Sequence, residues 1–235
     1  MKALILAGGL GTRLRTVVND RPKPMADVLG KPFLWYQLEY LRRFGMTDIV
    51  LSVGYLAEQV ISYFGSGERF GLRIEYVVET APLGTGGAIR NAGSLLSPSF
   101  VVLNGDTYYT FDLAECARAH RRSSAAISLL AFARQDGSDV GCLAVDDEGR
   151  VRGFEEKPES TGPCLASCGV YFMEAAVLNQ FPLKTPLSLE KEVLPALIRS
   201  GVDIRAIQVN DDFFDIGTPE RYQRFCEYVA RGRAR

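Results

Sequence analysis

The chain has little histidine and no excess of charge of either sign. Its 235 residues include 1 His, and 27 Lys and Arg residues stand against 28 Asp and Glu residues, for a formal net charge of -1. Without a basic excess no long-range field attracts nucleic acid, so we expect no nucleic-acid partner. Any anionic ligand must be met by individual Lys and Arg side chains. Catalysis by histidine is not expected, because His120 lies at the Arg-rich end of an expected helix, which is typical of a solvated residue.

Cysteine pairs with metal-binding or redox spacing are also missing. The 5 cysteines form no Cys-x-x-Cys pattern, and Cys164 and Cys168 have no second pair or histidine nearby. We therefore expect free thiols in buried or half-buried positions, which are typical of a reducing compartment. No apolar run reaches the ~18 residues of a membrane span, and the first is too short for a signal peptide. These absences predict a soluble cytoplasmic protein with no membrane partner.

What the chain has instead is an alternation of short apolar runs and amphipathic stretches. The hydrophobic fraction is 47%, enough for a sizeable core. The alternation predicts a parallel sheet covered by helices on both faces, with ligands at the carboxyl ends of its strands. In the first half we expect strands over 2–7, 48–53, 73–78 and 100–103 and helices over 33–44, 56–64 and 84–96.

The pattern is looser beyond residue 110. There is no low-complexity linker and no internal repeat, so one compact α/β unit fits best, with extra strands in its second half that cover the ligand. We expect strands over 126–131, 141–145, 151–155, 166–172 and 204–209 and helices over 111–122, 187–200 and 219–230.

A glycine-rich turn directly follows the first expected strand. In Leu6-Ala7-Gly8-Gly9-Leu10-Gly11, main-chain N–H groups can hold phosphate oxygens. The turn is neither a Walker A loop, which needs GxxxxGK[ST], nor a dinucleotide fingerprint, because Leu14 stands in place of the third glycine. Arg13 and Arg15 follow at once, and Lys23 lies between two prolines that restrict its backbone. The turn therefore predicts a phosphate-bearing ligand, and the alternative is that these cations are only solvated.

Five motifs lie in order along nearly the whole chain. They are Leu6–Leu14 with Pro22-Lys23-Pro24-Met25, Pro82–Ala88, Asn104-Gly105-Asp106, Phe154–Pro158 and Phe214–Pro219. Together they resemble the signature of the sugar-1-phosphate nucleotidylyltransferases. The resemblance implies one Rossmann-like domain of the GT-A type over 1–235, with a mainly parallel mixed sheet flanked by helices. It also implies a nucleotide-binding half over 1–110 and a sugar-phosphate-binding half over 111–235.

The resemblance also implies the reaction and the residues that serve it. A sugar 1-phosphate oxygen would attack the α-phosphorus of a nucleoside triphosphate, and pyrophosphate would leave. The enzyme would act by positioning and electrostatics. The catalytic cations would be Arg13 and Lys23. The nucleotide would be bound by Leu6, Gly8, Gly9, Gly11, Thr12, Glu79, Pro82, Gly84, Thr85, Asn104 and Gly105, and the sugar phosphate by Gly141, Glu156, Lys157 and Gly169. In one departure, Val140 stands where relatives often carry an aromatic residue.

Two aspartates, Asp106 and Asp215, match the family's Mg²⁺ ligands. Magnesium usually takes one or two carboxylates together with substrate phosphates and water, so one aspartate from each half of the chain fits its requirements. A purely local role is the alternative. Asp106 could cap the following turn, and Asp215 could form an Asx turn before Gly217.

The base and the sugar are harder to assign. Gly84-Thr85-Gly86-Gly87-Ala88 resembles guanylyl- and some uridylyltransferases, because thymidylyltransferases typically carry Gln-Ala after the glycine. Together with Ser188–Lys191, it resembles the bacterial branch that joins GTP and D-glycero-α-D-manno-heptose 1-phosphate into a GDP-heptose for capsule or surface-layer polysaccharide. GTP and this heptose 1-phosphate are thus the favoured partners.

Other interpretations stay open. One is a mannose-1-phosphate guanylyltransferase, and another is a uridylyltransferase acting on glucose or N-acetylmuramate 1-phosphate. A third, of a different class, is a catalytically silent regulatory subunit that senses sugar phosphates. Such a subunit is expected to lose Arg13, Lys23 or one of the aspartates, and all four are present. Many relatives are dimers, which leaves a homodimer open.

Overall fold

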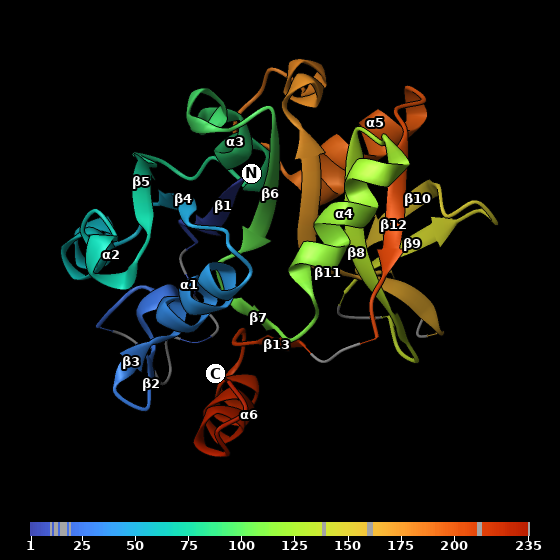
Figure 1. Ribbon diagram of the computed structural model, residues 1–235. Helices are drawn as coiled ribbons and strands as arrows, with labels where there is room; N and C mark the ends of the chain where they lie inside the picture. The colour runs from blue at the N-terminus through green and yellow to red at the C-terminus, as the bar shows by residue number, and fades with distance from the viewer. Residues whose placement is uncertain are drawn as a thin grey trace. The chain divides into compact units, whose positions relative to one another are not determined.

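The computed structural model describes residues 1–9, 11, 14, 18, 20–137, 140–158, 162–210 and 213–234 (Figure 1). The chain divides into two compact units that are not contiguous in sequence. We call residues 2–82, 103–110 and 211–235 the glycine-loop unit, and residues 83–102 and 111–210, with Met1, the hairpin unit. The strand β6 (Ser99–Asn104) contributes residues to both.

Three parallel strands form the sheet of the glycine-loop unit. The middle strand is buried over most of its length, as expected for a parallel sheet with both faces covered. The last residues of the three strands are in register. The residues that follow them, among them Gly8, Gly54 and Glu79, therefore lie at one edge of the sheet. The strands are β1 (Lys2–Ala7), β4 (Asp48–Val53) and β5 (Arg73–Val78), with β4 in the middle.

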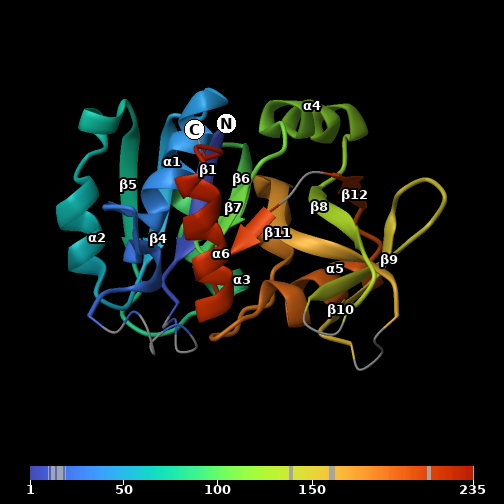
Figure 2. The ribbon, with the colours of Figure 1, turned by 90° about the horizontal axis from the view of Figure 1, so that it is seen from below.

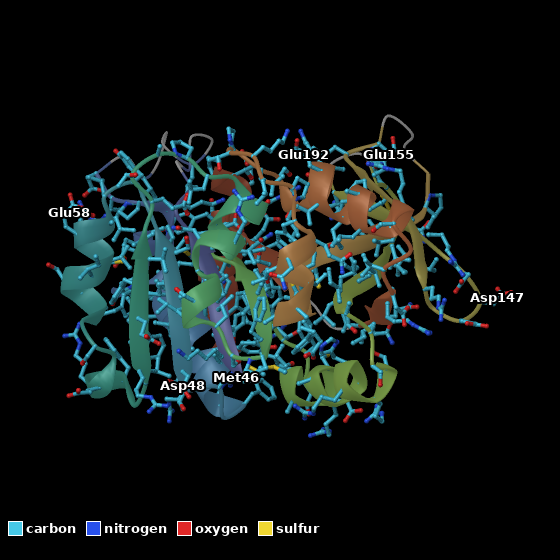
Figure 3. All side chains as sticks on the ribbon, turned by 90° about the horizontal axis from the view of Figure 1, so that it is seen from above. Met46, Asp48, Glu58, Asp147, Glu155 and Glu192 are labelled. Atoms are coloured by element: carbon cyan, nitrogen blue, oxygen red, sulfur yellow. A yellow bond between two sulfur atoms is a disulfide. The ribbon has the colours of Figure 1, made fainter. Side chains whose placement is uncertain are left out.

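Helices cover this sheet with their apolar sides. In α2, Val60 and Phe64 are buried while Glu58 points outward to solvent (Figure 3). The helices of the unit are α1 (Phe33–Arg43), α2 (Ala57–Phe64) and α6 (Pro219–Ala230), and its short 3-10 helices are η2 (Lys23–Met25) and η3 (Glu68–Phe70). A small hairpin of β2 (Asp27–Val28) and β3 (Lys31–Pro32) precedes α1.

An aromatic cluster fixes the C-terminal helix in this unit. Phe225 of α6 is fully buried, and its ring lies 5.0 Å from Phe33 and 5.7 Å from Tyr36 of α1. It also lies 5.2 Å from Tyr108 of β7 (Thr107–Tyr109) and 5.9 Å from Phe214 of β13 (Phe213–Asp215). In Figures 1 and 2, α6 is the red helix beside these two short strands. Since edge-to-face and tilted ring contacts are favourable, the cluster holds α6 and β13 against α1 and β7.

A mixed sheet forms the hairpin unit. Its strand β8 (Ile127–Arg134) pairs antiparallel with the central strand β11 (Cys164–Glu174) and parallel with β12 (Ile204–Gln208). The hairpin of β9 (Gly141–Val145) and β10 (Val151–Glu156) joins through β9 to β11. The helices are α3 (Thr85–Asn91), α4 (Leu113–Ser123), α5 (Leu194–Arg199), the 3-10 helices η4 (Gly93–Leu95) and η5 (Ala175–Gln180), and the π-helical turn η6 (Leu189–Val193).

The observed elements confirm the expected α/β class, with mixed strands flanked by helices. The strands expected over 2–7, 48–53 and 73–78 match β1, β4 and β5 residue for residue. Two long helices expected from the sequence are divided. The stretch over 84–96 is α3 followed by η4, and the stretch over 187–200 is η6 followed by α5. Among the described residues, no helix is long and apolar enough to cross a membrane.

The expectation that all cysteines are free thiols is wrong. Cys142 of β9 and Cys164 of β11 form a disulfide, and their Cα atoms are 5.9 Å apart. Their separation of 22 residues gives no local signal, because strand pairing brings them together. Cys116 and Cys168 are free and buried, and Cys226 is free and half-buried. The sequence-based argument for a reducing compartment therefore loses its support.

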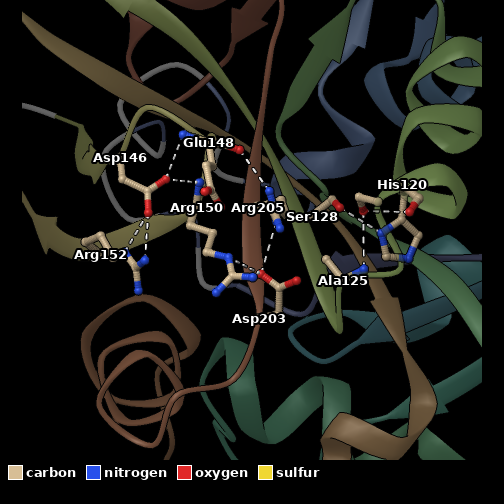
Figure 4. A network of polar contacts seen from close by, with 10 residues as sticks. His120, Ala125, Ser128, Asp146, Glu148, Arg150, Arg152, Asp203 and Arg205 are labelled. Carbon is tan, nitrogen blue, oxygen red and sulfur yellow. Dashed lines mark hydrogen bonds and ion pairs between the residues drawn. The ribbon is translucent and has the colours of Figure 1, made fainter.

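The solvated position expected for His120 is wrong as well. His120 is 1% exposed and forms hydrogen bonds on both sides of its ring, and Figure 4 shows the one to Ser128. Its Nδ1 lies 2.8 Å from Ser128 Oγ, and its Nε2 lies 3.2 Å from Glu174 Oε1. Burial lowers the pKa of His120, which favours the neutral imidazole. His120 lies in the core of the hairpin unit, where α4 buries its apolar side. Its hydrogen bonds join α4 to Ser128 of β8 and Glu174 of β11.

Candidate active site

The carboxyl edge of the parallel sheet carries an open stretch of backbone beside a carboxylate. Glu79 directly follows β5, and its Oε1 accepts a hydrogen bond of 2.8 Å from Ser52 Oγ. A Cβ atom placed on Gly8 would lie 2.5 Å from that same oxygen, so Glu79 crosses directly over Gly8. Gly9 is exposed, and a Cβ there would meet nothing within 4 Å. The glycine loop thus leaves room for a ligand, while the predicted Thr12 and Arg13 lie outside the described residues.

Lys23 lies against the glycine loop and reaches the first predicted metal ligand. Its Nζ is 2.6 Å from Asp106 Oδ2, and the two side chains are 12% and 37% exposed. A Cβ on Gly11 would lie 3.0 Å from Lys23 Cβ, so the stem of the lysine runs along the loop. The η2 turn that begins at Lys23 is flanked by Pro22. The sequence therefore grouped the glycine loop, Lys23 and Asp106 as the structure does.

The two predicted metal ligands also lie close together. In the antiparallel pair of β7 and β13, Asp215 is the register partner of Thr107, the residue after Asp106. Ile216 N donates to the Asp106 main-chain oxygen over 2.9 Å. Asp215 Oδ1 accepts from Gly217 N at 2.9 Å, which is the Asx turn considered above, and Oδ2 accepts from Arg221 Nη1 at 2.9 Å. The local role of Asp215 therefore coexists with its place beside Asp106.

This pair of carboxylates fits a magnesium ion that arrives with its substrate. Each of Asp106 and Asp215 already holds a cationic side chain, Lys23 or Arg221, so both face positive charge. No group of three or more His, Cys, Asp or Glu side chains suited to a metal occurs in the part of the chain that the structure describes. Magnesium needs only one or two carboxylates beside phosphates and water, whereas a permanently bound structural metal needs more protein ligands.

The turn at Asn104-Gly105 packs directly on the first strand. Gly105 N donates to Leu6 O over 3.0 Å, and a Cβ on Gly105 would lie 2.5 Å from that oxygen. Only glycine allows this approach without a shift of the backbone. Asn104 is half-buried. The contact between Gly105 and Leu6 therefore fixes the position of Asp106 relative to the carboxyl end of β1.

In the hairpin unit, the expected base-binding loop is held by main-chain contacts. Gly86 N and Gly87 N donate to Leu187 O over 2.9 and 3.1 Å. Thr85 Oγ1 donates to Glu190 Oε2 over 2.6 Å and accepts from Leu189 N over 2.8 Å. The Thr85 hydroxyl is thus used inside the protein, so any contact with a base would come from the backbone. Pro82, the start of the motif, is exposed and belongs to the glycine-loop unit.

Glu190 is a site residue that the sequence did not assign. Its carboxylate accepts hydrogen bonds from Thr85, from the buried Tyr171 at 3.3 Å and from Ser188 at 3.2 Å. It lies in η6, and π-helical turns are frequent at functional sites. The signal was present in Ser188–Lys191, which the resemblance matched without giving it a role. Glu190 thus contacts the expected base loop through Thr85, and its negative charge also acts on Glu156 of the expected sugar segment.

The expected sugar-phosphate residues meet at the start of the β9–β10 hairpin. Gly141 and Glu156 are register partners, and a Cβ on Gly141 would lie 2.9 Å from Glu156 Oε2. Lys157 has a φ of 56°, and its N donates to Val140 O over 3.0 Å. A left-handed conformation is strained for lysine, and such strain is frequent at ligand sites. Gly169 lies apart from them on β11, with a φ of 73° at the shift of register toward β8.

Burial raises the pKa of Glu156, and the negative charge of Glu190 adds to the rise, while Lys157 and Lys191 oppose it. The fold thus favours the protonated carboxyl, so the ionised form lowers stability at neutral pH. We expect Glu156→Gln to raise the melting temperature at neutral pH. The gain should shrink as the pH falls through the raised pKa and vanish below the ordinary value of 4.5. Thermal unfolding of both proteins across this pH range measures it, and a gain that persists in acid would contradict it.

Comparison with known proteins identifies the family of this chain. The model of the family described as "Nucleotidyl transferase" matches residues 2–231. The chain belongs to the nucleotidyl transferase family. A curated member, the D-glycero-alpha-D-manno-heptose 1-phosphate guanylyltransferase of Campylobacter jejuni, is 38% identical over 226 residues, which are 96% of this chain and 98% of the relative.

A second family member is nearly as similar in sequence. The mannose-1-phosphate guanylyltransferase of Mycobacterium tuberculosis is 37% identical over 233 residues, which cover 98% of this chain. This chain spans only 65% of the length of that relative. The family resemblance drawn from the five motifs is therefore confirmed, while two different sugars are named among similar relatives.

Solved structures of nucleotidyl transferase relatives share the fold. HddC from Yersinia pseudotuberculosis superposes with a TM-score of 0.83 at 33% identity and covers 97% of this chain and 99% of its own. A second crystal structure of HddC, complexed with GMP-PN, has a TM-score of 0.82. A structure from Bacillus anthracis at 23% identity has a TM-score of 0.87 and shows the fold alone.

Proposed function

We propose that the protein transfers a nucleotidyl group to a sugar 1-phosphate, with GTP as the donor and D-glycero-α-D-manno-heptose 1-phosphate as the acceptor. The observation that carries the proposal is the cluster of Lys23, Asp106 and Asp215 beside the glycine loop. It combines an open backbone, a cation and two adjacent carboxylates, which are the groups that phosphoryl transfer needs. The products would be pyrophosphate and a GDP-heptose, which surface polysaccharide synthesis would consume.

In the proposed reaction the glycine-loop unit binds the triphosphate. Main-chain N–H groups of Gly8, Gly9 and Gly11 would face phosphate oxygens. Lys23, whose ammonium is hydrogen-bonded to Asp106, would place that ammonium near the α-phosphate. Arg13 would add a planar pair of donors. Asp106 and Asp215 would hold Mg²⁺, which when bound draws negative charge from the phosphates. No protein nucleophile is needed, because the sugar phosphate oxygen itself attacks phosphorus.

The hairpin unit would bind the base and the sugar phosphate. Backbone groups at Gly84 and Thr85 would approach the base, since the Thr85 side chain is already occupied. Lys157 would hold the phosphate of the sugar, and Glu156 would accept hydrogen bonds from sugar hydroxyls. Gly141 and Gly169 would let the sugar come near the main chain. We propose these roles within one nucleotidyltransferase domain, with Val140 as the residue in which the sugar pocket departs from the family pattern.

Mannose 1-phosphate is the second candidate acceptor, because the mycobacterial relative is 37% identical over nearly the whole chain. The name of the Campylobacter relative favours the heptose, since that protein is matched over 98% of its own length. A silent regulatory subunit is disfavoured by the presence of Arg13, Lys23 and both aspartates. We also propose that the protein works in the cytoplasm, where nucleoside triphosphates are held, and as a homodimer like many relatives.

The deciding experiment measures pyrophosphate release from the purified protein with Mg²⁺. GTP, UTP and dTTP are each combined with the 1-phosphates of the heptose, mannose, glucose and N-acetylmuramate. We expect the highest kcat/KM for GTP with the heptose. A preference for mannose would select the second candidate, and a preference for UTP would replace the donor. If no combination releases pyrophosphate, the protein is a binding subunit and the proposed activity is wrong.

Removal of the Lys157 ammonium should act on the sugar phosphate alone. We expect Lys157→Ala to raise the KM for the sugar 1-phosphate about tenfold or more, with a much smaller change in the KM for GTP, because a charge-assisted hydrogen bond to phosphate is lost. Lys157→Gly removes the same charge and also relieves the positive φ. It should therefore show the same kinetics with a higher melting temperature than Lys157→Ala. A larger effect on the KM for GTP would mean that the two pockets are interchanged.

A further inference from the structure

A buried glutamine holds the turn that carries Asp106. Gln37 lies in α1 and is 1% exposed, among the buried Leu34, Leu38 and Leu41 of the same helix. Its Nε2 donates to two main-chain oxygens, Asn104 O at 2.8 Å and Thr107 O at 2.5 Å. An amide NH₂ has only two hydrogens, so both are used on this turn.

These two oxygens bracket the proposed metal ligand. Asn104 precedes Gly105 and Asp106, and Thr107 follows them, so one side chain fixes both ends of the turn. Two further main-chain contacts hold the residues between, from Gly105 N to Leu6 O at 3.0 Å and from Ile216 N to Asp106 O at 2.9 Å. The turn is therefore anchored from α1, from β1 and from the residue after β13.

Burial of Gln37 also has a free-energy cost, which a role in core packing alone does not explain. Gln37 Oε1 is buried and has no hydrogen-bond partner among the described residues. A buried polar atom without a partner costs free energy, and an apolar side chain of similar length would fill this face of α1 without that cost. Only the amide supplies two hydrogen-bond donors to the turn that carries Asp106.

We propose that Gln37 is a positioning residue for divalent-cation binding, because it holds the backbone on both sides of Asp106 in the conformation that directs the carboxylate to the ion. The inference rests on the proposed function, since it assumes that Asp106 is a metal ligand. Groups that orient a metal ligand typically affect metal affinity about 10–100-fold. Replacement of Gln37 should therefore weaken metal binding more than it changes any other property of the protein.

The test compares Gln37→Met with Tyr36→Phe. Methionine keeps the length of the side chain and removes both donors. Tyr36 is the neighbouring residue of α1, is 6% exposed and donates to Val28 O at 2.9 Å, so its replacement also removes one buried hydrogen bond to a carbonyl. Three properties are measured for each variant: the binding of Mn²⁺ by electron paramagnetic resonance with and without GTP, the Mg²⁺ concentration for half-maximal turnover, and the melting temperature.

We expect Gln37→Met to weaken Mn²⁺ binding about tenfold or more and to raise the Mg²⁺ requirement by a similar factor, with the KM for the sugar 1-phosphate unchanged. Tyr36→Phe should lower the melting temperature without changing Mn²⁺ binding. If both variants lose stability and neither loses Mn²⁺ affinity, Gln37 is only a structural residue and the inference is wrong. If Gln37→Met does not fold, Gln37→Leu, which also removes both donors and suits a buried helix position, decides in the same way.

Asp106→Asn separates this inference from the function on which it rests. If Asp106→Asn abolishes Mn²⁺ binding while Gln37→Met leaves it unchanged, the metal site is supported and the proposed role of Gln37 is wrong. If Asp106→Asn also leaves Mn²⁺ binding unchanged, the proposed metal site itself is wrong, and the inference about Gln37 is overturned with it.

Discussion

Asp215→Asn is expected to lower kcat at least about 100-fold while the protein stays folded. A neutral amide is a poor ligand for Mg²⁺, and even residues that only orient metal ligands typically change affinity or activity about 10–100-fold. The fold should persist because asparagine keeps the acceptor for Gly217 N, and because the pairing of β13 with β7 is made by main-chain atoms. The charge opposite Arg221 is lost, but this ion pair is about one third exposed and its loss costs little.

The control for this prediction is Asp146→Asn in the hairpin unit. Asp146 has a similar local environment. Its Oδ1 accepts from Glu148 N, two residues further along, and from Arg150 N, and its Oδ2 accepts from Arg152 at 2.8 Å (Figure 4). The Asp146→Asn variant therefore loses the carboxylate of an Asx turn and its ion pair with an arginine, but it loses no proposed metal ligand. Circular dichroism, melting temperature and kcat are compared for both variants. Near-normal turnover of Asp215→Asn, or an equal loss in Asp146→Asn, would remove Asp215 from the metal site.

The proximity of Asp106 and Asp215 depends on a feature that the sequence could not provide. The strands β7 and β13 have only three residues each and are far apart in the chain. Strands this short have no periodicity that could be read, and their pairing is decided by tertiary packing of the aromatic rings around Phe225. Asp106 and Asp215 were therefore paired through the family resemblance, and the structure supplies the physical reason for their proximity.

The buried parallel strands were the easiest elements to predict. A strand such as β4 is apolar over most of its length, because both faces of the sheet are covered, and glycine marks its end. The glycine loop and Lys23 could also be assigned from local chemistry, since a restricted lysine beside exposed main-chain N–H groups has few other uses. The sugar-phosphate segment, in contrast, was matched only through the family resemblance.

Buried polar residues were the main failures. Nothing local separates His120 in its Arg-rich helix from a solvated residue, yet Ser128 and Glu174, which lie on other elements, satisfy both of its ring nitrogens. Gln37 was missed for the same reason, because its hydrogen-bond partners are distant in sequence and leave no mark on neighbouring positions. Glu190 lies in the matched stretch Ser188–Lys191, but its contact with Thr85 is set by the fold.

The second large effect is expected for Gly84→Ala, which should destabilise the protein and disrupt the expected base loop. Gly84 has φ 75° and ψ 165°, a conformation that only glycine adopts readily. The added Cβ would also lie 2.5 Å from Leu187 O, a main-chain atom that already accepts from Gly86 N and Gly87 N and cannot move without breaking those bonds. The backbone strain alone costs about 1–3 kcal/mol.

Gly30→Ala separates the two causes of this loss. Gly30 has a φ of 82°, but a Cβ there would meet nothing within 4 Å, so the variant introduces strain without a clash. We expect Gly84→Ala to lower the free energy of unfolding in urea by more than Gly30→Ala does, and only Gly84→Ala to raise the KM for GTP. Equal losses of stability would show that Leu187 yields to the new methyl group at no cost. An unchanged KM for GTP would remove the segment from Gly84 to Gly87 from the base site, because the amides bonded to Leu187 O could then shift without effect on the nucleotide.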